Sequence, residues 1–127
     1  MQNIQSALGE ILSIDGALGA AFADWRRGDH VAYKFITSSD DFSQAELTLM
    51  VASSSEVIRN KALQSKKPGE KIIEIVFIYE KFFCLIRLVD AITGLFFLLV
   101  LEQGKANVAH ARLRLAQIVS ELQLSRK

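Results

Sequence analysis

The feature that most limits what this chain can fold into is the unbroken apolar run from Leu95 to Leu101. A strand with one face in water alternates apolar and polar residues, whereas a strand covered on both faces does not. The run therefore predicts a central strand whose sheet is covered on both faces. Two runs rich in β-branched and aromatic residues precede it, Ile72–Tyr79 and Phe82–Val89, and a tight turn around Glu80-Lys81 joins them.

The rest of the chain predicts two further strands and three helices. In chain order the predicted elements are a helix over 4–12, strands over 17–25 and 30–36, a helix from about 43 to 63 or 65, strands over 72–79, 82–89 and 95–101, and a helix after Gly104. Ser43 and Glu46 fit a capping box at the start of the middle helix. Hairpin-linked strands with helices between them predict an antiparallel sheet with helices on its faces, an α+β fold. The 127 residues and single proline indicate one domain, residues 1–127.

The middle helix has two apolar sides. At 100° per residue one side carries the residues expected to pack on the sheet, namely Leu47, Met50, Val51, Ser54, Val57, Ile58 and Ala62. A second apolar stripe lies nearly opposite and consists of Ala45, Leu49, Ala52 and Leu63. Because isolated exposed apolar residues are normal, this second stripe is only a candidate surface for contact with another protein.

Charge and cysteine content point away from several classes of partner. The net charge of +1 gives little reason to expect nucleic acid. The lysines Lys66, Lys67 and Lys71 are interpreted as solvated charges flanking a strand, and the less common alternative is a patch for phosphate or an acidic partner. One cysteine allows no internal disulfide. Ala91–Leu101 is far shorter than the roughly 20 apolar residues that span a bilayer, and the first residues do not resemble a signal peptide. We expect a cytoplasmic protein that does not insert into membranes.

No arrangement of residues predicts catalysis, a metal or a cofactor. Cys84 lies inside an apolar strand, where a buried inert thiol is expected, and His30 and His110 are distant from it in sequence. These residues have none of the usual spacings of metal ligands. No phosphate-binding glycine motif precedes a helix. Asp40-Asp41 is interpreted as helix capping and not as an acidic site.

Two arginines at the predicted hairpin tip have two interpretations. Arg26 and Arg27 could insert into a phosphate site of a partner, because a partner's arginine can stabilise charge during phosphoryl transfer. They are also typical of a solvated turn, which is the more common role. The neighbouring Trp25 is interpreted as a residue that packs against the hairpin and not as the centre of a binding surface.

Two stretches resemble the roadblock/dynein-light-chain superfamily. Residues 13–24, Ser-Ile-Asp-Gly-Ala-Leu-Gly-Ala-Ala-Phe-Ala-Asp, are similar to its first-strand motif. Residues 98–112, with Ala106-Asn107 and Ala111-Arg112, are similar to the last strand and final helix of bacterial stand-alone members. The resemblance implies a five-stranded antiparallel sheet with the long helix on one face and the two terminal helices on the other. It also implies no catalytic or metal site.

The resemblance further implies a dimer, either of two identical chains (a homodimer) or with a roadblock paralogue. The two chains would pair through their third strands and contact each other through their middle helices. Such dimers are platforms for small Ras-like GTPases, acting as activators or scaffolds, or light chains of motor complexes. If the strand Ile72–Tyr79 has only its short hairpin as a neighbour in sequence, its other side is a free apolar edge, which favours pairing on physical grounds. The residues predicted for the dimer interface are Met50, Ser54, Val57, Ile58, Ile73, Ile75 and Phe77. Those predicted for partner contact are Leu49, Ala52, Leu63, Arg26 and Arg27. The alternative is a small-molecule sensor of profilin-like fold, with a ligand cavity lined by the small residues of the first strand.

Overall fold

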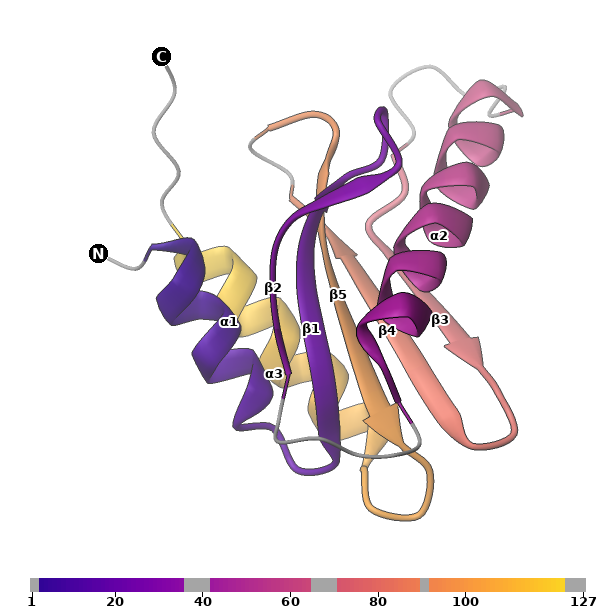
Figure 1. Ribbon diagram of the computed structural model, residues 1–127. Coiled ribbons are helices and arrows are strands. Elements are labelled where there is room, and N and C mark those ends of the chain that lie inside the picture. Colours follow the sequence, from indigo (N-terminus) through magenta and orange to yellow (C-terminus); the bar gives the residue numbers. More distant parts are fainter. Residues whose placement is uncertain (1–2, 36–41, 65–70, 90–91, 123–127) are drawn as a thin grey trace.

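The computed structural model describes residues 3–35, 42–64, 71–89 and 92–122, with residues 62–64 described by their backbone alone. Within them the chain forms one five-stranded antiparallel sheet and three helices (Figure 1). The elements are α1 (Ile4–Leu12), β1 (Ala17–Asp24), β2 (Asp29–Phe35), α2 (Gln44–Gln64), β3 (Glu74–Ile78), β4 (Phe82–Leu88), β5 (Leu95–Glu102) and α3 (Val108–Glu121). The strands lie in the order β2-β1-β5-β4-β3. The predicted α+β class and element order are confirmed.

The helices cover both faces of the sheet, as predicted. α1 and α3 lie side by side on one face and α2 lies on the other (Figure 1). Strand β5 occupies the centre, between β1 and β4, and residues 96–101 are fully buried. Alternate residues point to opposite faces, so that Phe97 packs with the α1/α3 cluster and Phe96 with the α2 cluster. The unbroken apolar run is thereby explained.

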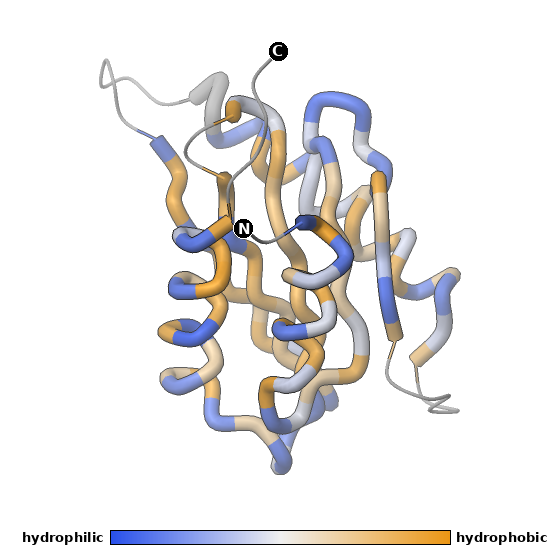
Figure 2. The backbone as a smooth tube through the Cα atoms, turned by 90° about the vertical axis from the view of Figure 1, so that its left-hand side faces the viewer, coloured by the Kyte–Doolittle hydropathy of each residue, from blue (hydrophilic) through white to orange (hydrophobic). Residues whose placement is uncertain are grey.

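Apolar residues follow the strands and polar residues gather at the turns and on the outer sides of the helices (Figure 2). A turn closes the β3–β4 hairpin, where the Tyr79 N–H donates to the Phe82 carbonyl over 2.8 Å. At the start of α2 the Ser43 hydroxyl accepts a 3.2 Å hydrogen bond from the Glu46 N–H, as half of a capping box does. The predicted caps Asp40-Asp41 lie outside the described residues. Among those described, no helix combines the length and apolar character needed to cross a membrane.

The small residues of β1 allow close packing on both faces. A β-carbon added at Gly19 would lie 3.1 Å from the Phe35 ring and 3.2 Å from the Phe42 ring. On the opposite face the Phe22 and Phe97 rings are 4.9 Å apart. The space over these small residues is therefore filled by aromatic side chains, which gives the ligand cavity of the sensor alternative no support at this strand.

The two stretches that resemble roadblock proteins meet in space. Gly16, with φ of +88°, lies so close to the segment before α3 that an added β-carbon would be 2.8 Å from the Ala106 β-carbon. The Gly16 carbonyl accepts a 2.8 Å hydrogen bond from the Glu102 N–H at the end of β5. Asn107 then caps α3 by accepting a hydrogen bond from the His110 N–H. The motif residues join the first strand to the last helix.

Candidate protein-interaction surface

Strand β3 forms one edge of the sheet. Among the described strands it pairs with β4 alone. Large apolar side chains are exposed along it: Ile73, which directly precedes the strand, is 61% exposed, Ile78 71% and Tyr79 44%. The edge thus combines unpaired backbone with exposed apolar surface, as the sequence predicted.

The predicted interface residues of this strand lie in one row. Ile75 and Phe77 are half-buried and pack against the α2 cluster, whereas the intervening Val76 packs against the α1/α3 cluster. Ile73 continues the row by strand alternation, since its carbonyl still accepts a 3.1 Å hydrogen bond from the Leu88 N–H. Ile73, Ile75 and Phe77 therefore present a half-open apolar surface beside α2.

The four predicted interface residues of α2 separate into two pairs. Met50 and Val57 are half-buried and remain partly accessible. Ser54 and Ile58 are only 2% and 1% exposed, because they face the sheet. Their assignment to a dimer interface is therefore corrected: both belong to the core of the single chain, together with Leu47.

Contacts on its other side fix the rotation of α2. The Thr48 hydroxyl lies 3.5 Å from His30 Nε2 on β2. The Arg59 guanidinium donates to the Trp25 carbonyl at the β1–β2 hairpin. Met50 and Val57 lie on the opposite side of the helix from Thr48 and Arg59, which turns them toward β4 and β3.

A network of charges holds β3 against α3. The Arg112 guanidinium donates from Nε and Nη2 to the two carboxylate oxygens of Glu74, over 2.8 and 3.0 Å. Arg87 Nη1 on β4 lies 3.7 Å from the same carboxylate. The hydrogen bonds from Arg112 lower the pKa of Glu74, although desolvation opposes them. Glu74 is thus the acidic residue that joins the edge strand to the helix beneath it.

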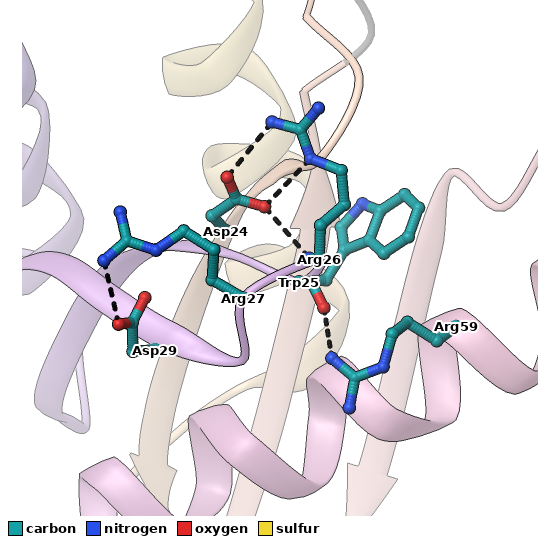
Figure 3. A network of polar contacts seen from close by, with 6 residues as sticks. All are labelled: Asp24, Trp25, Arg26, Arg27, Asp29 and Arg59. Carbon is teal, nitrogen blue, oxygen red and sulfur yellow. Dashed lines mark hydrogen bonds and ion pairs between the residues drawn. The ribbon is translucent and has the colours of Figure 1, made fainter.

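The β1–β2 hairpin tip carries the two predicted partner-contacting arginines in ion pairs (Figure 3). Arg26 donates from Nε and Nη2 to Asp24 over 3.2 and 3.1 Å, and Arg27 Nη2 donates to Asp29 over 3.1 Å. Arg26 lies so close to Gly94 that an added β-carbon there would be 2.4 Å from Arg26 Nε. Both guanidiniums stay largely exposed. Their local pairing favours the structural role, and neither is brought to β3.

Acid should weaken both carboxylate networks. Hydrogen bonds from Arg26 and Arg112 lower the pKa of Asp24 and Glu74 below their ordinary values of 3.8 and 4.5. A carboxyl group whose pKa is lower in the folded state stabilises the fold at pH values above its ordinary pKa. This stabilisation is lost as the pH falls through the lowered, folded-state pKa. Replacing both (D24N/E74Q) should therefore lower the free energy of unfolding at pH 7 and have less effect near pH 3. Urea denaturation at both pH values measures this; an equal loss at each would contradict it.

The outer surface of α2 carries the remaining predicted contacts. Leu49 is 66% exposed and Ala52 is exposed. Gln44, Ala45, Thr48 and Leu49 line an open depression at the start of the helix. The side chain of Leu63 and the lysines Lys66 and Lys67 lie outside the described residues. Leu49 is therefore the large apolar residue available for partner contact on this surface.

The cysteine and the two histidines lie apart in the structure. Burial raises the pKa of the Cys84 thiol to about 12, and the smaller effect of Ser54 opposes the shift. Such a thiol carries almost no thiolate at neutral pH. His30 contacts Thr48 on one face of the sheet, while His110 is exposed on α3. The described residues hold no cluster of three or more potential metal ligands.

Comparison with known proteins places the fold. No family model and no curated protein matches the sequence. Among solved structures, gliding protein MglB of Thermus thermophilus is similar with a TM-score of 0.71 at 19% identity, covering 96% of each chain. A Roadblock/LC7 domain of Streptomyces avermitilis gives 0.69 at 10% identity, covering 94% of this chain and 93% of that one. This chain has the roadblock fold. MglC of Myxococcus xanthus is similar with a TM-score of 0.60 at 20% identity, covering 93% of this chain and 98% of that one.

Proposed function

We propose that this roadblock chain is a non-enzymatic platform that dimerises through β3 and α2 and binds a small Ras-like GTPase in the cytoplasm. The observation that carries the proposal is the edge strand β3, with exposed apolar residues on both of its faces. Antiparallel pairing with a second β3 would satisfy the free backbone and cover Ile73, Ile75 and Phe77. One similar structure is described as MglB with a tetrameric arrangement, which supports self-association within this fold.

The test of the dimer is the mass of the protein in solution. Sedimentation equilibrium over a range of concentrations should give twice the chain mass of 14.1 kDa. A mass that stays at that of one chain up to high micromolar concentration would remove the dimer from the proposal. A partner paralogue would then be the remaining form of pairing, and co-expression with such a chain distinguishes the two.

The GTPase part of the proposal rests on the resemblance to roadblock proteins and on the outer surface of α2. Leu49 and Ala52 lie there beside the open depression, away from the β3 edge. A platform without catalytic groups changes GTP hydrolysis only by binding one switch conformation more tightly than the other. Arg27 adds a second possible contact, because its ion pair with Asp29 is more exposed than that of Arg26 with Asp24.

Replacing Leu49 with glutamate should weaken GTPase binding by about tenfold or more, because an apolar contact near the centre of an interface contributes on the order of 1–2 kcal/mol. Binding of the GTP-analogue and GDP forms of a Ras-like GTPase from the same genome, followed by interferometry, measures this, together with the hydrolysis rate. Leu113→Glu is the matched control, because Leu113 is 74% exposed on α3. If the wild-type chain binds neither nucleotide form, the GTPase proposal fails.

A further inference from the structure

A stripe of four side chains runs along the side of α2 that faces β3. Glu46, Met50, Val57 and Lys61 fall within an arc of about 60° when each residue turns the helix by 100°. The two charged residues at the ends are exposed, and the two apolar residues between them are half-buried. The opposite side of the helix is occupied by the hairpin contacts of Thr48 and Arg59. The stripe is therefore the flank of α2 next to the sheet that the hairpin contacts do not cover.

The four residues of the stripe lie at equal distances on either side of its midpoint, which falls between Ser53 and Ser54. Residues at equal distances also suit each other chemically, since one pair is oppositely charged and the other is apolar. Glu46 precedes it by the same number of residues as Lys61 follows it, and Met50 and Val57 are related in the same way. A second copy of the helix laid antiparallel would therefore place each Glu46 beside the Lys61 of the other copy, and each Met50 beside its Val57. Ser53 beside the midpoint is small and exposed, which allows close approach of the two helices.

The midpoint of the stripe lies at the level of the middle of the edge strand. Ser54 lies close enough to Cys84 on β4 to lower the pKa of that thiol, and Cys84 is paired directly with Phe77 on β3. Phe77 lies within the short strand Glu74–Ile78. One two-fold axis can therefore pass through the centre of an α2–α2 contact and the centre of a β3–β3 contact. A symmetric dimer needs this coincidence, because both contacts must share one axis.

The terminal charges of the stripe have no ion-pair partner inside the described part of the chain. We propose that the stripe is a self-recognition surface, which selects a second copy of this chain in one antiparallel register through two Glu46–Lys61 pairs around an apolar centre. The inference rests on the proposed dimer and deepens it. Roadblock chains that carry like charges at these positions would be disfavoured, because opposed like charges repel across an interface.

Charge reversal tests the register. Glu46→Lys and Lys61→Glu should each weaken self-association by about tenfold, because each turns two attractive pairs into two repulsive ones. Mixing the two variants should restore association as a heterodimer, in which both pairs are again oppositely charged. Glu56→Lys is the control, because it makes the same charge change on an exposed position of the outer helix surface. Energy transfer between chains that carry two different fluorescent labels, at low salt, measures both the homodimers and the heterodimer.

The mixture separates pairing from helix stability. A lysine in the first turn of α2 also disfavours the helix itself, since basic residues repel the helix N-terminus. Each variant keeps that defect in the mixture, so recovery there supports pairing between chains. If both reversals behave as Glu56→Lys does, or if the mixture shows no preference for the heterodimer, the self-recognition proposal is overturned while the dimer stands. If the wild-type chain is a monomer, both proposals fail together.

Discussion

An aspartate in place of Ile73 is expected to convert the proposed dimer into a monomer. Ile73 is 61% exposed in the single chain, so the substitution costs the monomer little. In the dimer the same side chain would be covered by a second β3, and burying an unpaired carboxylate costs several kcal/mol. We expect the dissociation constant to rise by about 100-fold or more, which corresponds to roughly 3 kcal/mol. Sedimentation equilibrium over a dilution series measures the change.

Leu113→Asp is the control for this prediction. Leu113 is 74% exposed, a similar fraction, but lies on α3 and not on the edge strand. It should leave both the mass in solution and the free energy of unfolding nearly unchanged. If Ile73→Asp is also without effect on the mass, β3 is not the dimer interface. The assignment of α2 to the same interface would then need its own evidence from the charge-reversal mixture.

Replacing Gly16 with alanine should cause the largest loss of stability among single small substitutions. Two independent costs combine at this position. The φ of +88° disfavours any side chain by about 1–2 kcal/mol. The added β-carbon would also lie 2.8 Å from the Ala106 β-carbon and 3.0 Å from the Ala106 backbone, which forces α3 and the first strand apart. We expect a total loss of about 3 kcal/mol, since overpacking adds a further 1–3 kcal/mol.

Gly104→Ala separates the two costs. Gly104 has nearly the same dihedral angle, φ of +86°, but an added β-carbon would meet nothing within 4 Å. It should therefore lose only the conformational part, about 1–2 kcal/mol. Urea denaturation of the two variants and the wild type gives the difference. Equal losses would mean that the contact between Gly16 and Ala106 contributes nothing to the stability of the fold.

Much of the fold could be predicted because local patterns are strong in this chain. The apolar run at Leu95–Leu101 required cover on both faces, and the structure provides it. Each predicted strand and helix is present, with ends that differ by at most a few residues. The pairing of β1 with β5 did not follow from periodicity. Which distant strands become neighbours depends on how helices of both layers fit together, and no local signal in the sequence carries that.

The candidate site could be predicted in part. The edge position of β3 followed from its having the strand of one short hairpin as its only neighbour in sequence, and Ile73, Ile75 and Phe77 do share one row. Helical spacing placed Ser54 and Ile58 on the apolar side of α2, but it could not separate the sheet-facing centre of that side from its margin. The contacts of Thr48 and Arg59 with the hairpin set that rotation, and they depend on tertiary structure. The ion pairs of Arg26 and Arg27 could have been predicted, since their partners Asp24 and Asp29 are each two residues away in sequence.

The pairing of the first strand with the last one bears on the order in which the chain folds. β1 has β2 and β5 as neighbours, and Ala17 pairs with Leu101. During synthesis the first hairpin is complete long before β5 leaves the ribosome. The backbone on one edge of β1 therefore stays unpaired until residues near the other end of the chain are made. Contacts between such distant segments slow folding, because the intervening loop must close before they form. We therefore expect nascent chains that stop before residue 95 to need protection from aggregation, and the full sheet to form in a late, cooperative step.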